Sequence, residues 1–213
     1  MKINKRNMLL YAITDRQWLN GRTLASQVEE VLKNGATFLQ LREKNLPYNE
    51  LVMEALEIKE IAARYNVPFV INDNIYAAKE AGADGVHIGQ GDASYKKARE
   101  LLGDGKIIGM TAHNLKEALA AQKAGADYIG AGAVFATSTK NNTIPMSFST
   151  LKEITDNVTI PVVAIGGINH VNITKLKDSG IAGAAVISAL FAQEDTGSAT
   201  ARMLNLCREV ING

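Results

Sequence analysis

Apolar and polar positions alternate along the chain in two distinct patterns. Short runs of consecutive apolar residues, typical of strands buried on both faces, are separated by longer stretches in which apolar residues recur every three or four positions. The clearest helical stripes cover residues 24–32 and 51–65, and each has one apolar face. The apolar runs predict strands that begin near Leu9, Phe38, Phe69, Gly85, Lys106, Tyr128, Pro161 and Gly183. The pattern therefore predicts eight strands with helices between them.

Glycine and short polar residues mark the expected ends of the helices. A glycine lies just before four of the predicted strands, at Gly35, Gly82, Gly125 and Gly180. We expect each to take a left-handed backbone conformation that ends a helix, because glycine has no Cβ to oppose it. Asn114 and Thr150 stand three residues before Glu117 and Glu153, so we expect both to begin helices as N-caps.

A series of strand-then-helix units predicts a parallel sheet covered by helices. Eight such units in 213 residues favour a single closed (β/α)8 TIM barrel domain spanning residues 1–213. An open doubly wound sheet is the alternative, and the strand count and chain length favour the barrel. No linker or shift in composition interrupts the series, and a chain of this length suits one large core rather than two.

Composition and charge narrow the range of partners. The formal net charge is +1, so the chain has no general electrostatic attraction to nucleic acid or to an anionic membrane. Cys207 is the only cysteine, which excludes an intramolecular disulfide and a metal cluster held by cysteines. The basic N-terminus has too short an apolar run for a signal peptide, and no later segment is long enough to span a membrane. We therefore expect a soluble cytoplasmic protein, with its oligomeric state open between monomer and homo-oligomer.

Polar residues follow most of the predicted strands. In a (β/α)8 barrel the carboxyl ends of the strands meet at one mouth, which carries the reactive groups. The second to sixth strands are expected to bring there Arg42, Lys44, Asn72, Asp73, Asp92, Thr111, Thr137, Ser138, Thr139 and Lys140. The seventh strand ends in the pair Gly166 and Gly167, and the eighth is followed by Ser188.

Two carboxylates at this mouth, Asp73 and Asp92, follow adjacent strands. Carboxylates beside cations suggest a magnesium–diphosphate complex, because Mg²⁺ binds through one or two carboxylates and completes its shell with water and substrate phosphates. Arg42, Lys44 and Lys140 are suited to the phosphate oxygens. Two alternatives stay open: an acid–base pair, or salt bridges in which the carboxylates neutralise Arg42 and Lys44.

Glycines and hydroxyls indicate a second anion site. Gly166, Gly167 and Ser188 match the phosphate cradle that barrels often build after their seventh and eighth strands. Residues 137–139 add three hydroxyls beside Lys140. A glycine pair also serves simple turns, and a run of Ser and Thr is often a solvated loop. Two phosphorylated groups at one mouth are the favoured interpretation.

The neighbouring residues predict different roles for two of the histidines. His87 lies within an apolar strand, so we expect a packed, hydrogen-bonded core group rather than a ligand. His113 follows the fifth strand near the mouth, within reach of a substrate. No Cys or Asp arrangement around His113 suggests a nucleophilic triad.

Seven motifs spread over nearly the whole chain resemble the thiamine-phosphate synthase family. They are YAITD, GATFLQLREK, VPFVIND, AGADGVHIGQGD, GADYIGAGAVFATSTK, IPVVAIGGI and AVISAL, in this order. The resemblance implies a transferase of thiamine biosynthesis that joins an aminopyrimidine methyl diphosphate to a thiazole ethyl phosphate and releases pyrophosphate. The thiazole nitrogen already has a lone pair, so the harder task is the departure of pyrophosphate, and a dissociative substitution is favoured.

The resemblance also implies roles for individual residues. The pyrimidine diphosphate would bind Gln40, Leu41, Arg42, Glu43, Lys44, Asn72, Thr111 and Lys140. Of these, the catalytic residues would be Arg42, Lys44, Thr111 and Lys140. The thiazole phosphate would bind Thr137, Ser138, Thr139, Gly167, Ile187 and Ser188. Asp73 and Asp92 would bind Mg²⁺ as the cofactor.

The chain departs from the usual family pattern at four positions. Asn74 and Tyr76 replace an arginine and an aspartate, Thr111 replaces a serine, and Phe148 stands where glycine is common. The alternatives are a thiazole tautomerase-like isomerase on the same barrel, and a non-catalytic protein that binds thiazole or thiamine phosphate. The tautomerase typically lacks the paired aspartates and the complete QLREK and TSTK motifs, whereas this chain has all of them. The synthase is therefore the favoured interpretation.

Overall fold

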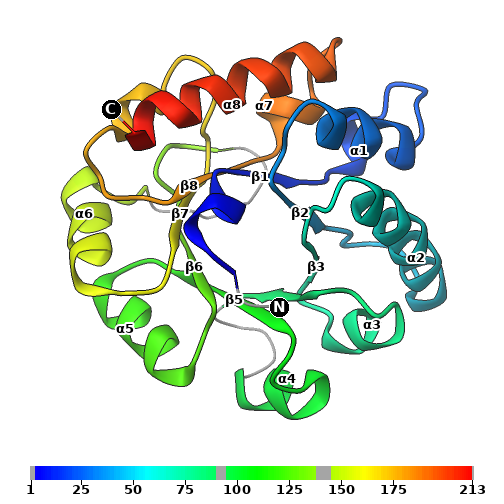
Figure 1. The fold of residues 1–213 in the computed structure, drawn as a ribbon, viewed down its shortest axis with the longest axis horizontal. Helices are drawn as coiled ribbons and strands as arrows, with labels where there is room; N and C mark the ends of the chain where they lie inside the picture. The colour runs from blue at the N-terminus through cyan, green and yellow to red at the C-terminus, as the bar shows by residue number, and fades with distance from the viewer. Residues whose placement is uncertain (1–2, 90–94, 138–144, 213) are drawn as a thin grey trace.

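Parallel strands close into a barrel in the computed structural model, which describes residues 3–89, 95–137 and 145–212 (Figure 1). Within these residues the strands are β1 Leu10–Ile13, β2 Phe38–Leu41, β3 Phe69–Asn72, β4 Gly85–Ile88, β5 Ile107–Ala112, β6 Tyr128–Gly132, β7 Val162–Ile165 and β8 Gly183–Val186. Each strand pairs in parallel with the next, and β8 pairs with β1 to close the ring. The expected (β/α)8 barrel is confirmed, and the open sheet is not formed.

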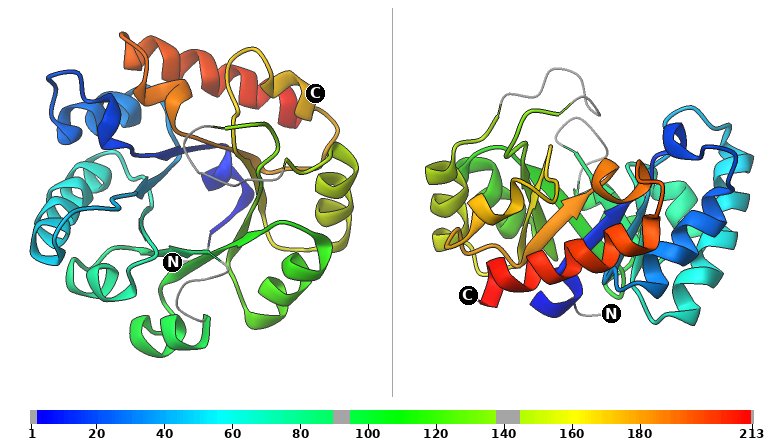
Figure 2. Two further views of the ribbon diagram at one scale, coloured as in Figure 1. Left: turned by 180° about the vertical axis from the view of Figure 1, so that it is seen from behind. Right: turned by 90° about the horizontal axis from the view of Figure 1, so that it is seen from above.

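Helices surround the barrel on its outer side (Figures 1 and 2). They are α1 Leu24–Lys33, α2 Tyr48–Arg64, α3 Ile75–Glu80, α4 Tyr95–Leu102, α5 Leu115–Ala124, α6 Phe148–Asn157, α7 Ser188–Phe191 and α8 Thr196–Asn212. The 3-10 helices of the described residues are η1 Lys5–Met8, η2 Arg16–Trp18 and η3 Ile173–Leu176, and η3 takes the place of a regular helix between β7 and β8. In the part of the chain that the structure describes, no helix is long and apolar enough to cross a membrane.

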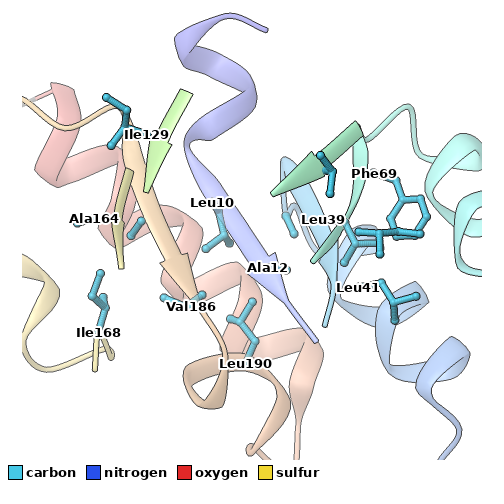
Figure 3. Packing of buried hydrophobic residues seen from close by; sticks show 14 of the residues in the cluster. Leu10, Ala12, Leu39, Leu41, Phe69, Ile129, Ala164, Ile168, Val186 and Leu190 are labelled. Atoms are coloured by element: carbon cyan, nitrogen blue, oxygen red, sulfur yellow. The ribbon is translucent and has the colours of Figure 1, made fainter. Parts of the chain in front are cut away.

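Side chains along each strand alternate between two layers of the core. On β1, Leu10 and Ala12 belong to the layer between strands and helices, whereas Tyr11 and Ile13 belong to the layer inside the barrel. Figure 3 shows part of the outer layer, including Leu41 at the end of β2. This alternation also decides which residues at a strand end can reach the mouth of the barrel.

Local sequence signals locate most element boundaries. Every strand begins at its expected residue or one residue later. The four glycines have φ values of 105° at Gly35, 62° at Gly82, 96° at Gly125 and 80° at Gly180, so the left-handed conformation is confirmed at all four. Gly180 does not end a helix, because η3 ends at Leu176. The side chain of Asn114 accepts the backbone N–H of Glu117 at 2.9 Å and caps α5, also as expected.

The expected helix start at Thr150 is wrong. Helix α6 begins three residues earlier, and its N-cap is Ser147. The hydroxyl of Ser147 accepts the backbone N–H of Thr150 at 3.0 Å, which places Thr150 in the first turn. Serine and threonine are both good N-caps. Ser147 is the one that pairs with an N–H group that the first turn of α6 leaves without a partner in the helix.

Candidate active site

A pocket of about 290 Å³ opens at the carboxyl ends of the strands. Every strand of the barrel contributes to its lining, either from its last residues or from the loop that follows it. Ten of the side chains or glycines predicted to bind substrate or metal line it, namely Gln40, Arg42, Lys44, Asn72, Asp73, Thr111, Thr137, Gly167, Ile187 and Ser188. Residues far apart in the sequence therefore meet around one space.

The other predicted site residues fall into two groups. Leu41 and Glu43 turn away from the pocket, so side-chain contacts with a ligand there are not expected from them. Leu41 is fully buried in the outer layer of the core, and Glu43 binds an arginine on the outer side of the loop. Asp92, Ser138, Thr139 and Lys140 lie outside the described residues.

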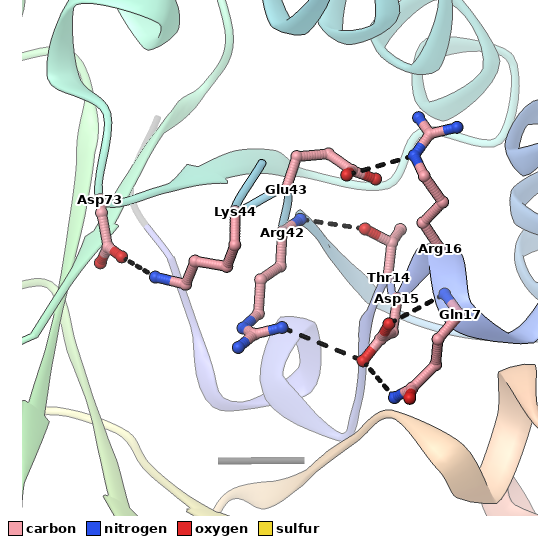
Figure 4. A network of polar contacts seen from close by, with 8 residues as sticks. All are labelled: Thr14, Asp15, Arg16, Gln17, Arg42, Glu43, Lys44 and Asp73. Atoms are coloured by element: carbon pink, nitrogen blue, oxygen red, sulfur yellow. Dashed lines mark hydrogen bonds and ion pairs between the residues drawn. The ribbon is translucent and has the colours of Figure 1, made fainter. Parts of the chain in front are cut away.

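Asp73 and Lys44 form an ion pair inside the pocket (Figure 4). The Nζ atom of Lys44 lies 2.5 Å from Oδ2 of Asp73, and the side-chain amide of Asn72 donates to the same oxygen at 2.5 Å. The backbone of Asp73 has a φ of 62°, and its N–H donates to the carbonyl oxygen of His87 at 2.8 Å. The left-handed backbone of Asp73 interrupts the alternation of side chains between the two faces of β3, while its N–H stays hydrogen-bonded to β4.

Arg42 is hydrogen-bonded through its backbone, and its guanidinium lies near a carboxylate (Figure 4). Its N–H donates to the hydroxyl of Thr14 at 2.9 Å, and Nη1 lies 3.9 Å from Oδ2 of Asp15. Asp15 was not predicted as part of the site. It ends the motif YAITD, so the rule that polar residues after strands face the mouth would have found it.

Glu43 fixes the outer side of the same loop. Its carboxylate lies 3.3 Å from Nε of Arg16, which also forms an ion pair with Glu54 on α2. The Glu43 side chain is only 6% exposed, and burial together with the nearby charge of Glu54 raises the pKa of Glu43. Glu43 thus points outward between Arg42 and Lys44, which both line the pocket, and the Arg16 contact holds this arrangement.

Glycines shape the opposite part of the lining, after β7. Gly166 and Gly167 have φ values of 101° and 63°, which L side chains rarely adopt. A Cβ on Gly167 would lie 2.2 Å from the backbone oxygen of Ala136, and one on Gly166 would lie 2.5 Å from Cβ of Ala133. The loops after β6 and β7 therefore pack backbone to backbone here, which only glycine allows.

The two histidines of the mouth occupy different environments. His87 is 6% exposed, with Nδ1 2.9 Å from the Tyr128 hydroxyl and Nε2 3.0 Å from the Thr111 hydroxyl, which confirms the predicted packed and hydrogen-bonded group. It also lines the pocket, which was not predicted. His113 lines the pocket and contacts Glu117 through Nδ1 at 2.8 Å. Burial opposes the charge on Glu117, but hydrogen bonds from His113 and Asn114 hold its pKa below the usual range.

The positions that depart from the family pattern lie mostly away from the pocket. Asn74 caps α3 by accepting the N–H of Ala77 at 2.9 Å, Tyr76 lies under Lys97 with Nζ 5.4 Å from the ring centre, and Phe148 is exposed on α6. None of these three belongs to the pocket lining that the described residues form. Thr111 does line the pocket, and it keeps the hydroxyl that a serine would supply.

The donor chemistry of the pocket suits a hard cation bound together with a phosphate. Asp73 supplies a carboxylate, although no group of three metal-binding side chains occurs among the described residues. Mg²⁺ needs only one or two protein carboxylates when substrate phosphates complete its shell. Arg42 and Lys44 supply positive charge for such phosphates from the same part of the pocket.

Comparison with known proteins finds relatives along nearly the whole chain. Residues 10–190 match a protein-family model described as thiamine monophosphate synthase. The chain is 48% identical over 201 residues to a thiamine-phosphate synthase of Clostridium novyi, covering 94% of this chain and 98% of that protein. It is 44% identical over 203 residues to a thiamine-phosphate synthase of Ruminiclostridium cellulolyticum, covering 95% and 97% respectively. A thiamine phosphate pyrophosphorylase structure from Pyrococcus furiosus matches with a TM-score of 0.88 and 37% identity, covering 97% of this chain and 98% of that one.

Proposed function

The chain belongs to the thiamine monophosphate synthase family, and on that premise we propose that it joins an aminopyrimidine methyl diphosphate to a thiazole ethyl phosphate. The products are thiamine phosphate and pyrophosphate. The observation that carries this proposal is that one pocket brings together two sets of groups suited to anions. Arg42, Lys44 and Asp73 line one part, after β2 and β3, while Gly167 and Ser188 line another, after β7 and β8.

Each part suits one phosphorylated substrate. We assign the diphosphate to Arg42 and Lys44, whose charges match several phosphate oxygens, and the pyrimidine to Gln40, Asn72 and Thr111. The thiazole phosphate is assigned to Thr137, Gly167, Ile187 and Ser188. Two substrates held side by side make the reaction effectively unimolecular, which lowers its entropic barrier.

The residues of the pocket act mainly on the leaving diphosphate. Carbon–oxygen bond breaking builds negative charge on the diphosphate oxygens, and the cationic side chains of Arg42 and Lys44 stabilise that charge. The thiazole nitrogen attacks with its own lone pair, so no side chain must act as a strong base. Asp73, together with Asp92, would hold a magnesium ion, which neutralises diphosphate charge when it is bound.

A direct assay tests the proposed function. Purified protein with both phosphorylated substrates and magnesium is expected to form thiamine phosphate and pyrophosphate in equal amounts, measured by chromatography and a coupled phosphate assay. Conversion of a thiazole phosphate without consumption of the pyrimidine would instead identify an isomerase. Binding of both ligands without pyrophosphate release would identify a non-catalytic protein.

Ser188→Ala tests the thiazole phosphate assignment. We expect its KM for the thiazole phosphate to rise about tenfold, because a lost hydrogen bond to a charged group costs about 1.5 kcal/mol, while the KM for the pyrimidine diphosphate stays near that of the wild type. Steady-state kinetics with each substrate varied in turn measures both values. Ser26→Ala, on the exposed side of α1, is the matched control.

Equal changes in the two KM values would count against this assignment. Gly167→Ala is a poorer probe, because its Cβ would meet the oxygen of Ala136 at 2.2 Å and its φ of 63° would be strained. A loss of activity in that variant would report a displaced loop rather than a lost phosphate contact.

A further inference from the structure

Three consecutive carbonyl oxygens at the end of β7 accept hydrogen bonds on the side away from the pocket. The oxygens of Ile165 and Gly166 accept the backbone N–H groups of residues 134 and 135, after β6, at 2.9 Å and 3.1 Å. The third oxygen, that of Gly167, accepts from the side-chain amide of Asn172 at 2.8 Å. None of these donors belongs to the pocket lining that the described residues form.

The N–H groups of the same three peptides point in the opposite direction. All three peptides are trans, and a trans peptide places its C=O and its N–H on opposite sides. These N–H groups belong to Gly166, Gly167 and Ile168, and all three residues line the pocket. The loop after β7 therefore turns its backbone donors towards the pocket and its acceptors towards the protein.

The N–H of Ile168 is a buried donor that no described residue accepts. The side chain of Ile168 packs in the outer layer of the core (Figure 3) and the residue is 4% exposed, so its backbone is the part that faces the pocket. Within the described residues no hydrogen bond takes the N–H of Ile168 or that of Gly167. Native proteins rarely leave a buried backbone donor unpaired, so we expect a ligand to supply the acceptor. A phosphate suits this place because its charged oxygens form strong hydrogen bonds with backbone N–H groups.

Asn172 fixes the orientation of the last of the three peptides. While its Nδ2 donates to the oxygen of Gly167, its Oδ1 accepts the backbone N–H of Asn169 at 2.8 Å. Oδ1 of Asn169 accepts in turn from the N–H groups of Val171 at 2.9 Å and Asn172 at 3.1 Å. The two side chains thus hold the turn in one shape. Gly167 alone would leave its carbonyl free to rotate, because glycine has no Cβ to restrict the backbone.

We propose that Asn172 is a positioning residue that holds the peptide between Gly167 and Ile168 with its N–H towards the pocket, where the N–H groups of these two residues donate to the phosphate of the thiazole substrate. The proposal rests on the proposed function, which places that phosphate at Gly167 and Ser188. Without the Nδ2 donor, the peptide can turn over and bring a carbonyl oxygen towards the phosphate, a contact between two acceptors. Asn172 acts through the backbone and does not touch the substrate itself.

Asn172→Asp removes the donor and keeps the shape of the side chain. An oxygen replaces Nδ2 and faces the oxygen of Gly167, while Oδ1 can still accept from Asn169. We expect the Kd of the thiazole ethyl phosphate, measured by calorimetry, to rise at least about tenfold, or about 1.4 kcal/mol, as for a lost hydrogen bond to a charged group. The Kd of the pyrimidine diphosphate should stay within a factor of about two of the wild type.

Asn169→Asp is the matched control, because it adds the same charge to the same turn. In the hydrogen bonds of the described residues the Asn169 side chain only accepts, so aspartate can replace it. This variant should keep the Kd of the thiazole ethyl phosphate within a factor of about two of the wild type. Asn172→Ala removes the donor without adding charge and should also raise that Kd, including in the event that Asn172→Asp does not fold.

The amide signals of Gly167 and Ile168 report the proposed contact directly. In ¹⁵N-labelled wild type, NMR is expected to show both amide protons moving downfield when thiazole ethyl phosphate binds, because they then donate to charged oxygens. The unphosphorylated thiazole alcohol should leave both signals in place. In Asn172→Asp saturated with thiazole ethyl phosphate, the shift of the Ile168 signal should be lost, whereas a residue that only stabilises the fold would leave that shift intact.

Three results would overturn the proposal. One is an Ile168 amide signal that does not respond when thiazole ethyl phosphate binds to the wild type. Another is an unchanged Kd for that ligand in either folded variant of Asn172. The third is an equal rise of the Kd in Asn169→Asp, because added charge would then explain the effect. A wild type that binds no thiazole ethyl phosphate would overturn the proposed function instead.

Discussion

Asp73→Asn is expected to lower kcat/KM for the pyrimidine diphosphate by about a hundred- to a thousandfold, the usual cost of removing one preorganised charge from a reacting centre. The variant loses the negative charge that we propose for magnesium binding and leaves Lys44 without its partner at 2.5 Å. Asparagine is the right substitute because, like aspartate, it tolerates the φ of 62°, whereas alanine would add backbone strain. Initial rates measured over a range of magnesium concentrations check the prediction.

The magnesium dependence separates the two interpretations of Asp73. If Asp73 binds the ion, the magnesium concentration for half-maximal rate should rise, and excess magnesium should restore part of the activity. If Asp73 only neutralises Lys44, that concentration stays unchanged. Asp156→Asn, which alters an exposed ion pair on α6, is the control. Both variants should melt near the wild type, since exposed ion pairs contribute only about 0–1 kcal/mol.

Arg42→Ala is expected to lower kcat by at least about thirtyfold, a conservative value for a cation aimed at a leaving group. The charge on the diphosphate oxygens grows towards the transition state, so the loss should fall on kcat more than on substrate binding. Arg42→Lys should recover only part of the rate, because lysine keeps the charge but not the planar fork of donors. Single-turnover measurement of pyrophosphate release reports the bond-breaking step directly.

Arg42 is not at the leaving group if the bond-breaking rate of Arg42→Ala stays within a factor of about two of the wild-type rate. Such a change is far smaller than the tenfold that about 1.4 kcal/mol represents. Arg64→Ala is the matched control, since Arg64 pairs with Glu29 on the outer surface. The structure adds a check on folding. Arg42 is held by Thr14 through its backbone N–H, which alanine retains, so the loop itself should keep its position.

The division between the inner and outer sides of the barrel separates the residues of one predicted motif. Residues 40–44 form one motif, yet Gln40, Arg42 and Lys44 line the pocket, whereas Leu41 and Glu43 do not. A match to such a motif assigns all of its residues to the site together. The pleat of β2 and the contact between Glu43 and Arg16 divide it into alternate faces.

The sequence by itself determined the elements and the end of the barrel at which the site lies. Continuous apolar runs, helical stripes and left-handed glycines are local signals, because burial on two faces and backbone strain act within a few residues. They located the start of every strand to within one residue. The rule that polar residues after parallel strands share one mouth then indicated Arg42, Lys44 and Asp73 together.

Only the tertiary structure decided how these side chains are oriented and connected. Closure of the ring brings Tyr11 to Tyr128 across 117 residues of sequence, and Tyr128 to His87 across 41. No local pattern encodes such contacts, because each residue alone is simply an inward-facing side chain of a strand. Which polar groups lie within hydrogen-bonding distance of one another, such as His87 and Thr111, therefore follows from closure of the barrel.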